Sequence, residues 1–276
     1  IRLSLVGSEM CIETGCTSAV STTVTINALP VVAAITGTTS VCEGATTTLA
    51  STTTGGVWST ANTATATINS TTGVVTGVAA GTTTMTYTVT NANGCTSSVS
   101  TALVVNAIPQ VAAISGTTEV CVGLTTALAN ATASGVWTSS NTAVATIDAS
   151  GVVTGVAAGS TTITYTVTTN GCTANAQAVV NVNALPTLAA IGGTMNACIG
   201  SSTILTNTTS GGVWTTSNAA VATVNTITGN VTGVTAGTAT ITYTYTNSNG
   251  CTSAVSTTVT INALPVVAAI TGTTSV

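Results

Sequence analysis

The sequence predicts an all-β fold in which small β-sandwich domains follow one another in tandem as an extended rod. The first observation is a repeat: Trp58, Trp137 and Trp214 stand at the same place in three similar passages of the chain. The second is an alternation of apolar residues with threonine inside short segments. A fixed period of about 78 residues indicates an array of small units, each a complete supersecondary block. It excludes a single catalytic core that spans the whole chain.

The strands can be read within one unit. In residues 84–90, Met, Tyr and Val alternate with four threonines, so the apolar side chains share one face. Asn-Gly follows this segment at 93–94, 170–171 and 249–250 and predicts a hairpin, because both residues tolerate positive φ. Residues 99–105 then form the last strand of the unit. β-Branched residues dominate and glycine recurs often, so no helix is expected.

The unit boundaries are marked by proline. The last strand of each unit is followed by the junction Asn-Ala-Leu-Pro or Asn-Ala-Ile-Pro. Its proline cannot donate a ladder hydrogen bond and makes the connection to the next unit rigid. We therefore predict sandwich domains at 28–106, 107–183 and 184–262, with almost no linker. Residues 1–27 are expected to be the terminal strands of a partial unit, and residues 263–276 the first strand of a following unit.

The composition excludes several classes of partner. Only 2% of the residues are charged, and Arg2 is the only cation. One cation cannot neutralise a phosphate backbone, so we expect no nucleic-acid binding. No apolar run approaches the length of about 18 residues that a membrane-spanning helix needs, so we expect no membrane insertion. The first ten residues lack the pattern of a secretory signal, which favours a mature fragment or a window from a longer protein.

The sequence also predicts that the protein is not an enzyme. Catalysis needs a general base, an activated nucleophile or a metal ion. Histidine is absent, and the repeats share no acidic position, since Asn69 and Asn225 replace Asp148 in the other units. Calcium loops need clustered carboxylates and zinc sites need clustered Cys or His, and neither cluster occurs. We therefore expect no catalytic, cofactor or metal site.

Cysteine is distributed evenly over the units. Each unit has one cysteine near its start, here called early, and one after the hairpin turn, here called late. We predict disulfides within the units, each stabilising its unit by roughly 4 kcal/mol in the chain-entropy model. The predicted bonds are Cys42–Cys95, Cys121–Cys172 and Cys198–Cys251. They would indicate an oxidising, extracellular location. Cys11 and Cys16 lie in the irregular head, which is similar to a unit without its middle, and we expect the two to pair with each other by default.

One family resemblance rests on the second half of each unit. The second unit reads WTSSNTAVATID at 137–148, GVVTGVAAG at 151–159 and TTITY at 161–165, which closely resembles the bacterial immunoglobulin-like group 2 domain. Residues 28–50 are similar to cysteine-bearing modules of giant surface proteins from biofilm-forming bacteria. The resemblance implies immunoglobulin-like β-sandwiches that serve as spacers or adhesive modules in intimin- and invasin-like proteins. It carries no catalytic residues, and a disulfide departs from the common form of the domain.

The tryptophans have two interpretations. We predict that Trp58, Trp137 and Trp214 are core residues packed beside the disulfides, as in immunoglobulin-type sandwiches. The alternative is an exposed platform on which a sugar ring stacks. Threonine rows such as residues 82–90 also suggest an ice-binding surface, but a flat solenoid would repeat at a much shorter period.

Two functional hypotheses remain. The first is a structural segment of an extracellular filament or cell-surface stalk, made of disulfide-linked domains. The alternative is an adhesive module that binds a glycan or protein ligand on a host or neighbouring cell. A binding site would be expected as one unit with distinctive aromatic or arginine-rich loops, whereas the loops are bland in all three units.

The sequence also predicts that the partner of this chain is the same protein. Residues 15–41 and 250–276 are identical over 27 positions, so the longer period of the sequence comprises three units. A lone strand has unpaired backbone groups and seeks a sheet edge. We therefore expect residues 263–276 to complete a sandwich by strand addition, in another copy or in continuing chain of the same protein. A cropped stretch of one giant polypeptide would have the same sequence.

Overall fold

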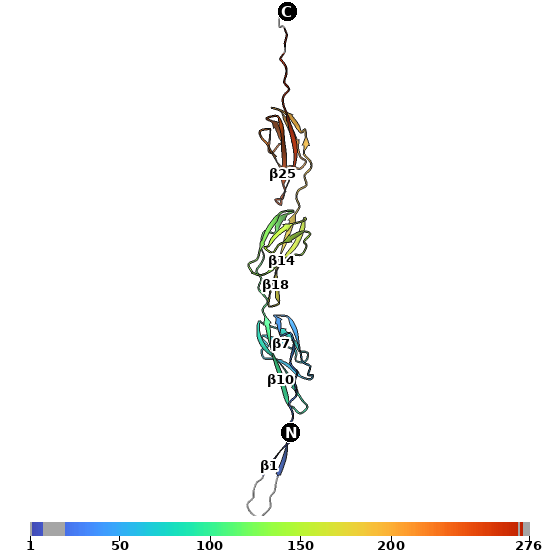
Figure 1. The fold of residues 1–276 in the computed structure, drawn as a ribbon, viewed down its shortest axis with the longest axis vertical. Helices are drawn as coiled ribbons and strands as arrows, with labels where there is room; N and C mark the ends of the chain where they lie inside the picture. The colour runs from blue at the N-terminus through green and yellow to red at the C-terminus, as the bar shows by residue number, and fades with distance from the viewer. Residues whose placement is uncertain (1, 8–19, 270, 273–276) are drawn as a thin grey trace, which may run out of the picture. The chain divides into compact units, whose positions relative to one another are not determined.

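The computed structural model describes residues 2–7, 20–269 and 271–272, and every regular element in them is a β-strand (Figure 1). Three immunoglobulin-like sandwiches follow one another along the chain, each made of two four-stranded sheets. Among the described residues, no helix has the length and apolar character that crossing a membrane requires. The predicted all-β class with tandem sandwiches is confirmed.

The first sandwich, sandwich 1, shows the topology that all three share. One sheet has the order β3 (Thr36–Gly37), β5 (Thr46–Ala50), β8 (Val74–Gly77) and β7 (Ala66–Ile68). The other has the order β4 (Ser40–Cys42), β10 (Thr96–Asn106), β9 (Gly81–Thr90) and β6 (Val57–Thr60). Strand β4 is parallel to β10, and Cys42 lies opposite Asn106.

Sandwiches 2 and 3 repeat this order. In sandwich 2 one sheet has the order β11 (Ser115–Gly116), β13 (Thr125–Ala129), β16 (Val152–Gly155) and β15 (Ala145–Ile147). The other has the order β12 (Glu119–Cys121), β18 (Cys172–Asn183), β17 (Gly159–Thr169) and β14 (Val136–Ser139). In sandwich 3 one sheet has the order β19 (Gly192–Gly193), β21 (Ser202–Thr206), β24 (Asn230–Gly233) and β23 (Ala222–Val224). The other has the order β20 (Asn196–Cys198), β26 (Thr252–Asn262), β25 (Gly237–Thr246) and β22 (Val213–Thr216). Judged by compactness, the chain divides into two parts, here called compact units to distinguish them from the repeats. The first contains residues up to 111 together with 167–174, and the second contains residues 112–166 together with those from 175 onwards.

The alternation of apolar and threonine residues places the core. Along β9 every second residue is buried, from Thr83 through Met85 and Tyr87 to Val89. The side chains of Leu49, Val75, Met85 and Leu103 are fully buried in sandwich 1. Equivalent aliphatic residues fill the other two cores, so sandwiches without phenylalanine still have a continuous apolar centre.

A tyrosine closes each core at one end. The Tyr87 hydroxyl accepts a hydrogen bond of 2.9 Å from the Gly56 N–H and donates one of 2.8 Å to the Thr53 carbonyl. Tyr165 and Tyr243 make the same two contacts in their own sandwiches. A Cβ at Gly56 would clash with the Tyr87 ring, so only glycine fits there.

The Asn-Gly turns differ between the units. In sandwich 2, Asn170 and Gly171 both have positive φ, 51° and 81°, as expected for a two-residue hairpin. In the other units only Gly94 and Gly250 have positive φ, and the side chain of Asn91 or Asn247 accepts backbone N–H bonds within a longer loop. The predicted hairpin is present in all three units, and the loop is longer in sandwiches 1 and 3.

The two ends of the described chain lie outside the sandwiches. β1 (Arg2–Gly7) pairs antiparallel with β2 (Val20–Thr25) in a sheet of two strands. Residues 263–269 and 271–272 form no strand and are exposed. The predicted pair Cys11–Cys16 lies outside the described residues.

Candidate functional site at the disulfide junctions

The cysteine pairing differs from the predicted one. The described part of the chain contains two disulfides, Cys42–Cys172 and Cys121–Cys251, each with a sequence separation of 130 residues and Cα atoms 5.6 Å apart. Each joins the early cysteine of one unit to the late cysteine of the next. Cys95 and Cys198 are free thiols. The predicted bonds Cys42–Cys95, Cys121–Cys172 and Cys198–Cys251 were therefore wrong.

The direction of the last strand explains this outcome. Cys95 directly precedes β10, whereas Cys42 lies opposite Asn106 at the far end of the same strand. Strand β10 has 11 residues, which at about 3.3 Å per residue separates the two cysteines by roughly 35 Å. A disulfide requires Cα atoms about 4.4–6.8 Å apart. The early and late cysteines of one unit therefore cannot bond without disrupting the sandwich.

The next hairpin along the chain supplies the partner instead. The tip of the β17–β18 hairpin belongs to the same compact unit as sandwich 1. There the Asn106 side-chain amide donates a hydrogen bond of 3.4 Å to the Asn170 carbonyl, and the Cys172 Sγ lies 3.8 Å from the Asn106 carbonyl oxygen. A disulfide junction therefore has three parts: an early cysteine, the asparagine opposite it, and the late cysteine of the next hairpin.

The second junction has the same construction. Cys121 lies opposite Asn183 in the parallel pair of β12 and β18. The Cys251 Sγ lies 3.8 Å from the Asn183 carbonyl oxygen, and the Asn247 side chain donates a hydrogen bond of 3.2 Å to the Ala184 carbonyl. Cys121, Cys172 and Cys251 are all buried, which shields these bonds from reductants in solution.

Sequence reasoning missed this pairing, although a signal was present. The separation between an early cysteine and the next unit's late cysteine is 130 residues in both bonded pairs. The separation between the two cysteines of one unit is not constant, because it is shorter in the second unit than in the other two. The sequence alone did not show that the early strand runs parallel to the last strand. Without that direction, the expected partner of each early cysteine is the late cysteine that is nearest to it in the sequence.

The tryptophans lie in the sandwiches, away from any exposed platform. Trp58 and Trp214 are 5% and 3% exposed, and Trp137 is half-buried. Each indole packs against the tyrosine of its own sandwich, with ring centroids 4.5–4.6 Å apart. The predicted packing of each indole beside a disulfide of its own sandwich was wrong, because each described disulfide joins two sandwiches.

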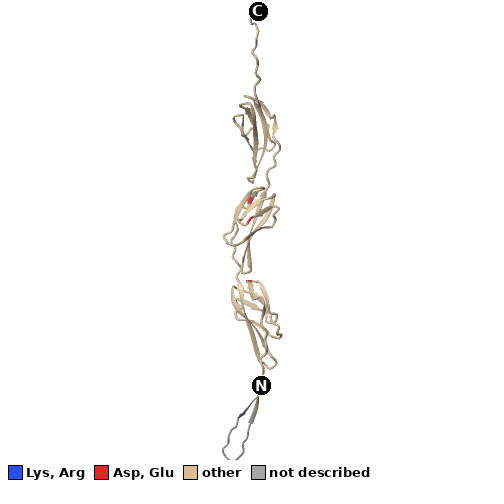
Figure 2. Cartoon of the chain, viewed as in Figure 1, with Lys and Arg blue, Asp and Glu red and all other residues tan. Residues whose placement is uncertain are grey.

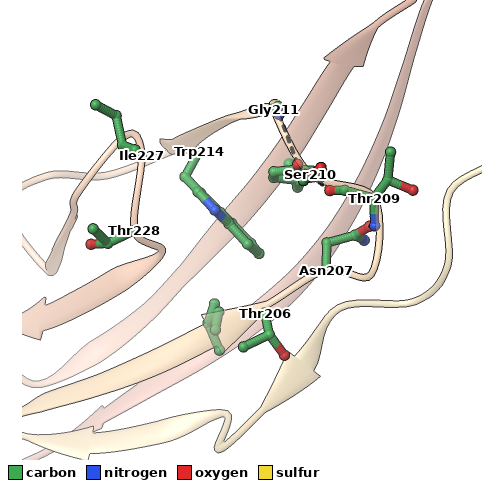
Figure 3. Close-up of a pocket in the computed structure, with 11 residues that line it drawn as sticks. Thr206, Asn207, Thr209, Ser210, Gly211, Trp214, Ile227 and Thr228 are labelled. Carbon is green, nitrogen blue, oxygen red and sulfur yellow. Dashed lines mark hydrogen bonds between the residues drawn. The ribbon is translucent and has the colours of Figure 1, made fainter.

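A hollow lies over the Trp214 indole (Figure 3). Its volume is about 270 Å³, and its rim comes from Asn207, Thr209, Ser210 and Thr228. Two of the groups that line it are already hydrogen-bonded to each other, because the Gly212 N–H donates a hydrogen bond of 2.8 Å to the Tyr243 hydroxyl. A similar hollow, lined by Thr53, Thr71 and Trp58 among others, occurs in sandwich 1. The rims carry no charged group, so this hollow has little with which to orient a ligand.

The described chain has few acidic residues, which are coloured red in Figure 2, and the carboxylates of Glu119 and Asp148 accept hydrogen bonds within sandwich 2. Asn181 and Asn183 donate hydrogen bonds of 2.7 and 2.8 Å to Glu119, which lower the pKa of that carboxyl below its usual value. The Ser150 hydroxyl, at 2.6 Å, and the Val152 N–H, at 2.9 Å, likewise lower the pKa of Asp148. The described residues contain no group of three or more side chains able to hold a metal ion.

Comparison with known proteins gives the family and the fold. The sequence model for the bacterial Ig-like domain (group 2) matches residues 103–180 and 201–264, together just over half of the chain. A search of curated proteins finds no match.

Solved structures of low sequence identity match most of the chain. Domains 1–6 of the surface-layer protein SbsC are 18% identical over 97% of this chain and 45% of that one, with a TM-score of 0.27. A Ca²⁺-stabilised adhesin that helps an Antarctic bacterium bind ice is 14% identical over 95% of this chain and 82% of that one, with a TM-score of 0.35. An I-band fragment of titin is 12% identical over 84% of this chain and 99% of that one, with a TM-score of 0.33. The chain spans just under half the length of the surface-layer structure.

Proposed function

Because this chain belongs to the bacterial Ig-like group 2 family, whose repeat domains are generally non-catalytic structural modules, we propose that it is a tension-resisting segment of an extracellular bacterial filament or adhesin stalk. The observation that carries the proposal is the staggered pairing Cys42–Cys172 and Cys121–Cys251. A disulfide within one domain protects that domain alone. These bonds connect each domain covalently to the next one.

The staggered bonds shorten the covalent path through the chain. Without them, about 210 residues separate Cys42 from Cys251, and full extension would reach roughly 700 Å. With both bonds in place, the shortest path crosses from Cys42 to Cys172, runs back along the chain to Cys121 and crosses to Cys251, so it contains only the stretch 121–172. That path extends to roughly 170 Å, whereas a single remaining bond leaves the stretch 42–121 or the equally long stretch 172–251, which extends to roughly 270 Å. A pulled chain therefore stops lengthening well before all three sandwiches are stretched out.

The location and the modules belong to the same proposal. Disulfides persist in oxidising compartments, which supports a cell-surface or secreted location. We retain 28–106, 107–183 and 184–262 as the modules, each docking its hairpin tip on the end of the preceding one. The indoles packed against the core tyrosines and the uncharged hollows favour this structural role over recognition of a glycan or protein ligand.

Single-molecule force spectroscopy tests the proposal. The chain would be pulled from its two ends in a background that carries Cys95→Ser and Cys198→Ser, so that the free thiols take no part. The double variant Cys172→Ser with Cys251→Ser should reach a fully extended length greater by about 160 residues, or roughly 540 Å.

The single variants are the matched controls. Cys172→Ser alone and Cys251→Ser alone should each lengthen the extended chain by the same small amount, about 28 residues or roughly 95 Å, because one remaining bond leaves the stretch 42–121 or the equally long stretch 172–251 as the path. Equal lengths for the parent and the double variant would overturn the proposal. So would a single variant that lengthens the chain as much as the double variant does.

A further inference from the structure

We propose that Cys198 and Cys95 are the two open ends of a continuous disulfide ladder, and that Cys198 bonds to Cys95 of a following repeat of this same sequence. The inference deepens the proposed function, since it names the partner to which the junctions connect. Both residues are free; Cys198 is partly buried like the bonded early cysteine Cys42, whereas Cys95 is more exposed than the bonded late cysteines Cys172 and Cys251, which are buried.

The surroundings of Cys198 match those of the bonded early cysteines. Cys198 lies opposite Asn262 in the parallel pair of β20 and β26, as Cys42 lies opposite Asn106. The N–H that follows the cysteine donates to this asparagine carbonyl in both places, Ile199 at 3.1 Å and Glu43 at 3.0 Å. Two parts of a junction are therefore in place at Cys198, and the late cysteine is missing.

The surroundings of Cys95 match those of the bonded late cysteines. The Cys95 Sγ lies 4.0 Å from the Asn27 carbonyl oxygen, compared with 3.8 Å at the other two hairpin tips. The Asn91 side chain donates a hydrogen bond of 2.9 Å to the Ala28 carbonyl, as Asn247 does to Ala184. The hairpin tip is thus docked on the end of a preceding last strand, and here the early cysteine is missing.

The repeat of the sequence brings the two half-junctions together. Residues 250–276 are identical to residues 15–41, so Asn262 corresponds to Asn27. Superposing these segments places Cys198 and the Cys95 of the following repeat on the same asparagine carbonyl. A single disulfide there would complete a junction of the kind seen twice in this chain.

The bond forms by thiol–disulfide exchange with a small-molecule disulfide such as oxidised glutathione. The Cys198 thiolate attacks one sulfur of that disulfide, which releases one small thiolate and leaves a mixed disulfide. The Cys95 thiolate of the following repeat attacks the Cys198 sulfur and releases the second small thiolate. Two protein thiols are oxidised, and one small disulfide is reduced to two thiols.

The test is a chain in which residues 42–276 are joined again after Val276, which continues the period without a break. The first copy carries Cys95→Ser and the appended copy carries Cys198→Ser, so that one Cys198, in the first copy, and one Cys95, in the appended copy, remain to react. After refolding with reduced and oxidised glutathione, non-reducing peptide mapping should find Cys198 linked to the appended Cys95 within one molecule. Both residues should be lost from the pool that an alkylating reagent labels.

Controls separate the possible outcomes. Cys198→Ser should return the appended Cys95 to the alkylated pool and leave the Cys42–Cys172 and Cys121–Cys251 peptides unchanged. The original chain, refolded in the same buffer, tests whether the following repeat can be a separate copy of the chain and not only its continuation. Covalent oligomers that contain Cys198–Cys95 peptides would show that it can. A Cys198 that stays alkylatable in the longer chain, or that bonds to another cysteine, would overturn the inference. That result would leave the proposed function standing, because its force measurement excludes both free thiols.

Discussion

One stretch of sequence occurs twice in this chain and has two different environments. In β26, Val259 and Ile261 are 0% and 2% exposed in the core of sandwich 3. The identical positions Val24 and Ile26 are 45% and 57% exposed at the other end of the chain. Both strands have alternating apolar residues, but β2 pairs only with β1. Alternation makes one face of a strand apolar, and burial requires an opposing sheet.

The segment after this strand shows the same contrast. Val32 packs on the core of sandwich 1, and the Ala33 N–H donates a hydrogen bond of 2.9 Å to the Thr53 hydroxyl. The corresponding Val267 is 85% exposed. Each end of the described chain thus repeats a segment that is packed elsewhere. The matched positions provide a control for every substitution in the packed copy.

The largest expected effect comes from the last strand. Ile261→Ala should destabilise sandwich 3 by about 2–5 kcal/mol, because it leaves a cavity in a packed core. The matched Ile26→Ala should change stability by less than about 0.5 kcal/mol. Urea unfolding measures both costs, with Ile261→Ala followed through Trp214 fluorescence and Ile26→Ala through Trp58 fluorescence, and with the other two tryptophans replaced by Phe in each case. Equal costs for the two substitutions would mean that the two copies share one environment.

A smaller effect is expected in the segment that follows. Val32→Ala should destabilise sandwich 1 by about 1 kcal/mol, because Val32 is only partly buried against the core. Val267→Ala should be neutral in the isolated chain. Val32→Ala would be followed through Trp58 in sandwich 1 and Val267→Ala through Trp214 in sandwich 3, with the other two tryptophans replaced by Phe in each case. A measurable cost for Val267→Ala would show that this residue is packed after all.

These pairs explain how far the sequence could predict the structure. The period between the tryptophans and the alternation along 83–89 predicted the tandem sandwiches and the buried face of β9, since both depend on local pattern. The disulfides could not be predicted in this way. Their pairing depends on which end of the sandwich each cysteine occupies, and therefore on the parallel course of β4 and β10. Likewise, no local property distinguishes Val24 from Val259, because the sequences around them are identical.

The smallest expected effect concerns pH, and it tests whether apolar burial alone maintains sandwich 3. Residues 184–262 contain no carboxylate side chain, and Asn225 holds the turn that Asp148 holds in sandwich 2. The hydrogen bonds from the Ser150 hydroxyl and the Val152 N–H lower the pKa of Asp148 below its ordinary value of 3.8. A carboxyl whose pKa is lower in the folded state stabilises the fold above its unfolded pKa, and this contribution is lost as the pH falls through the folded pKa.

Sandwich 2 should therefore become slightly less stable below about pH 4, whereas sandwich 3 should not respond. Asp148→Asn should reduce the acid sensitivity of sandwich 2, and Glu119, whose pKa is also lowered, should account for the rest. Thermal unfolding between pH 2 and 6, followed separately through Trp137 and Trp214, measures both. A sandwich 3 that weakens in acid as much as sandwich 2 would show that groups outside residues 184–262 contribute to holding Val259 and Ile261 in their core.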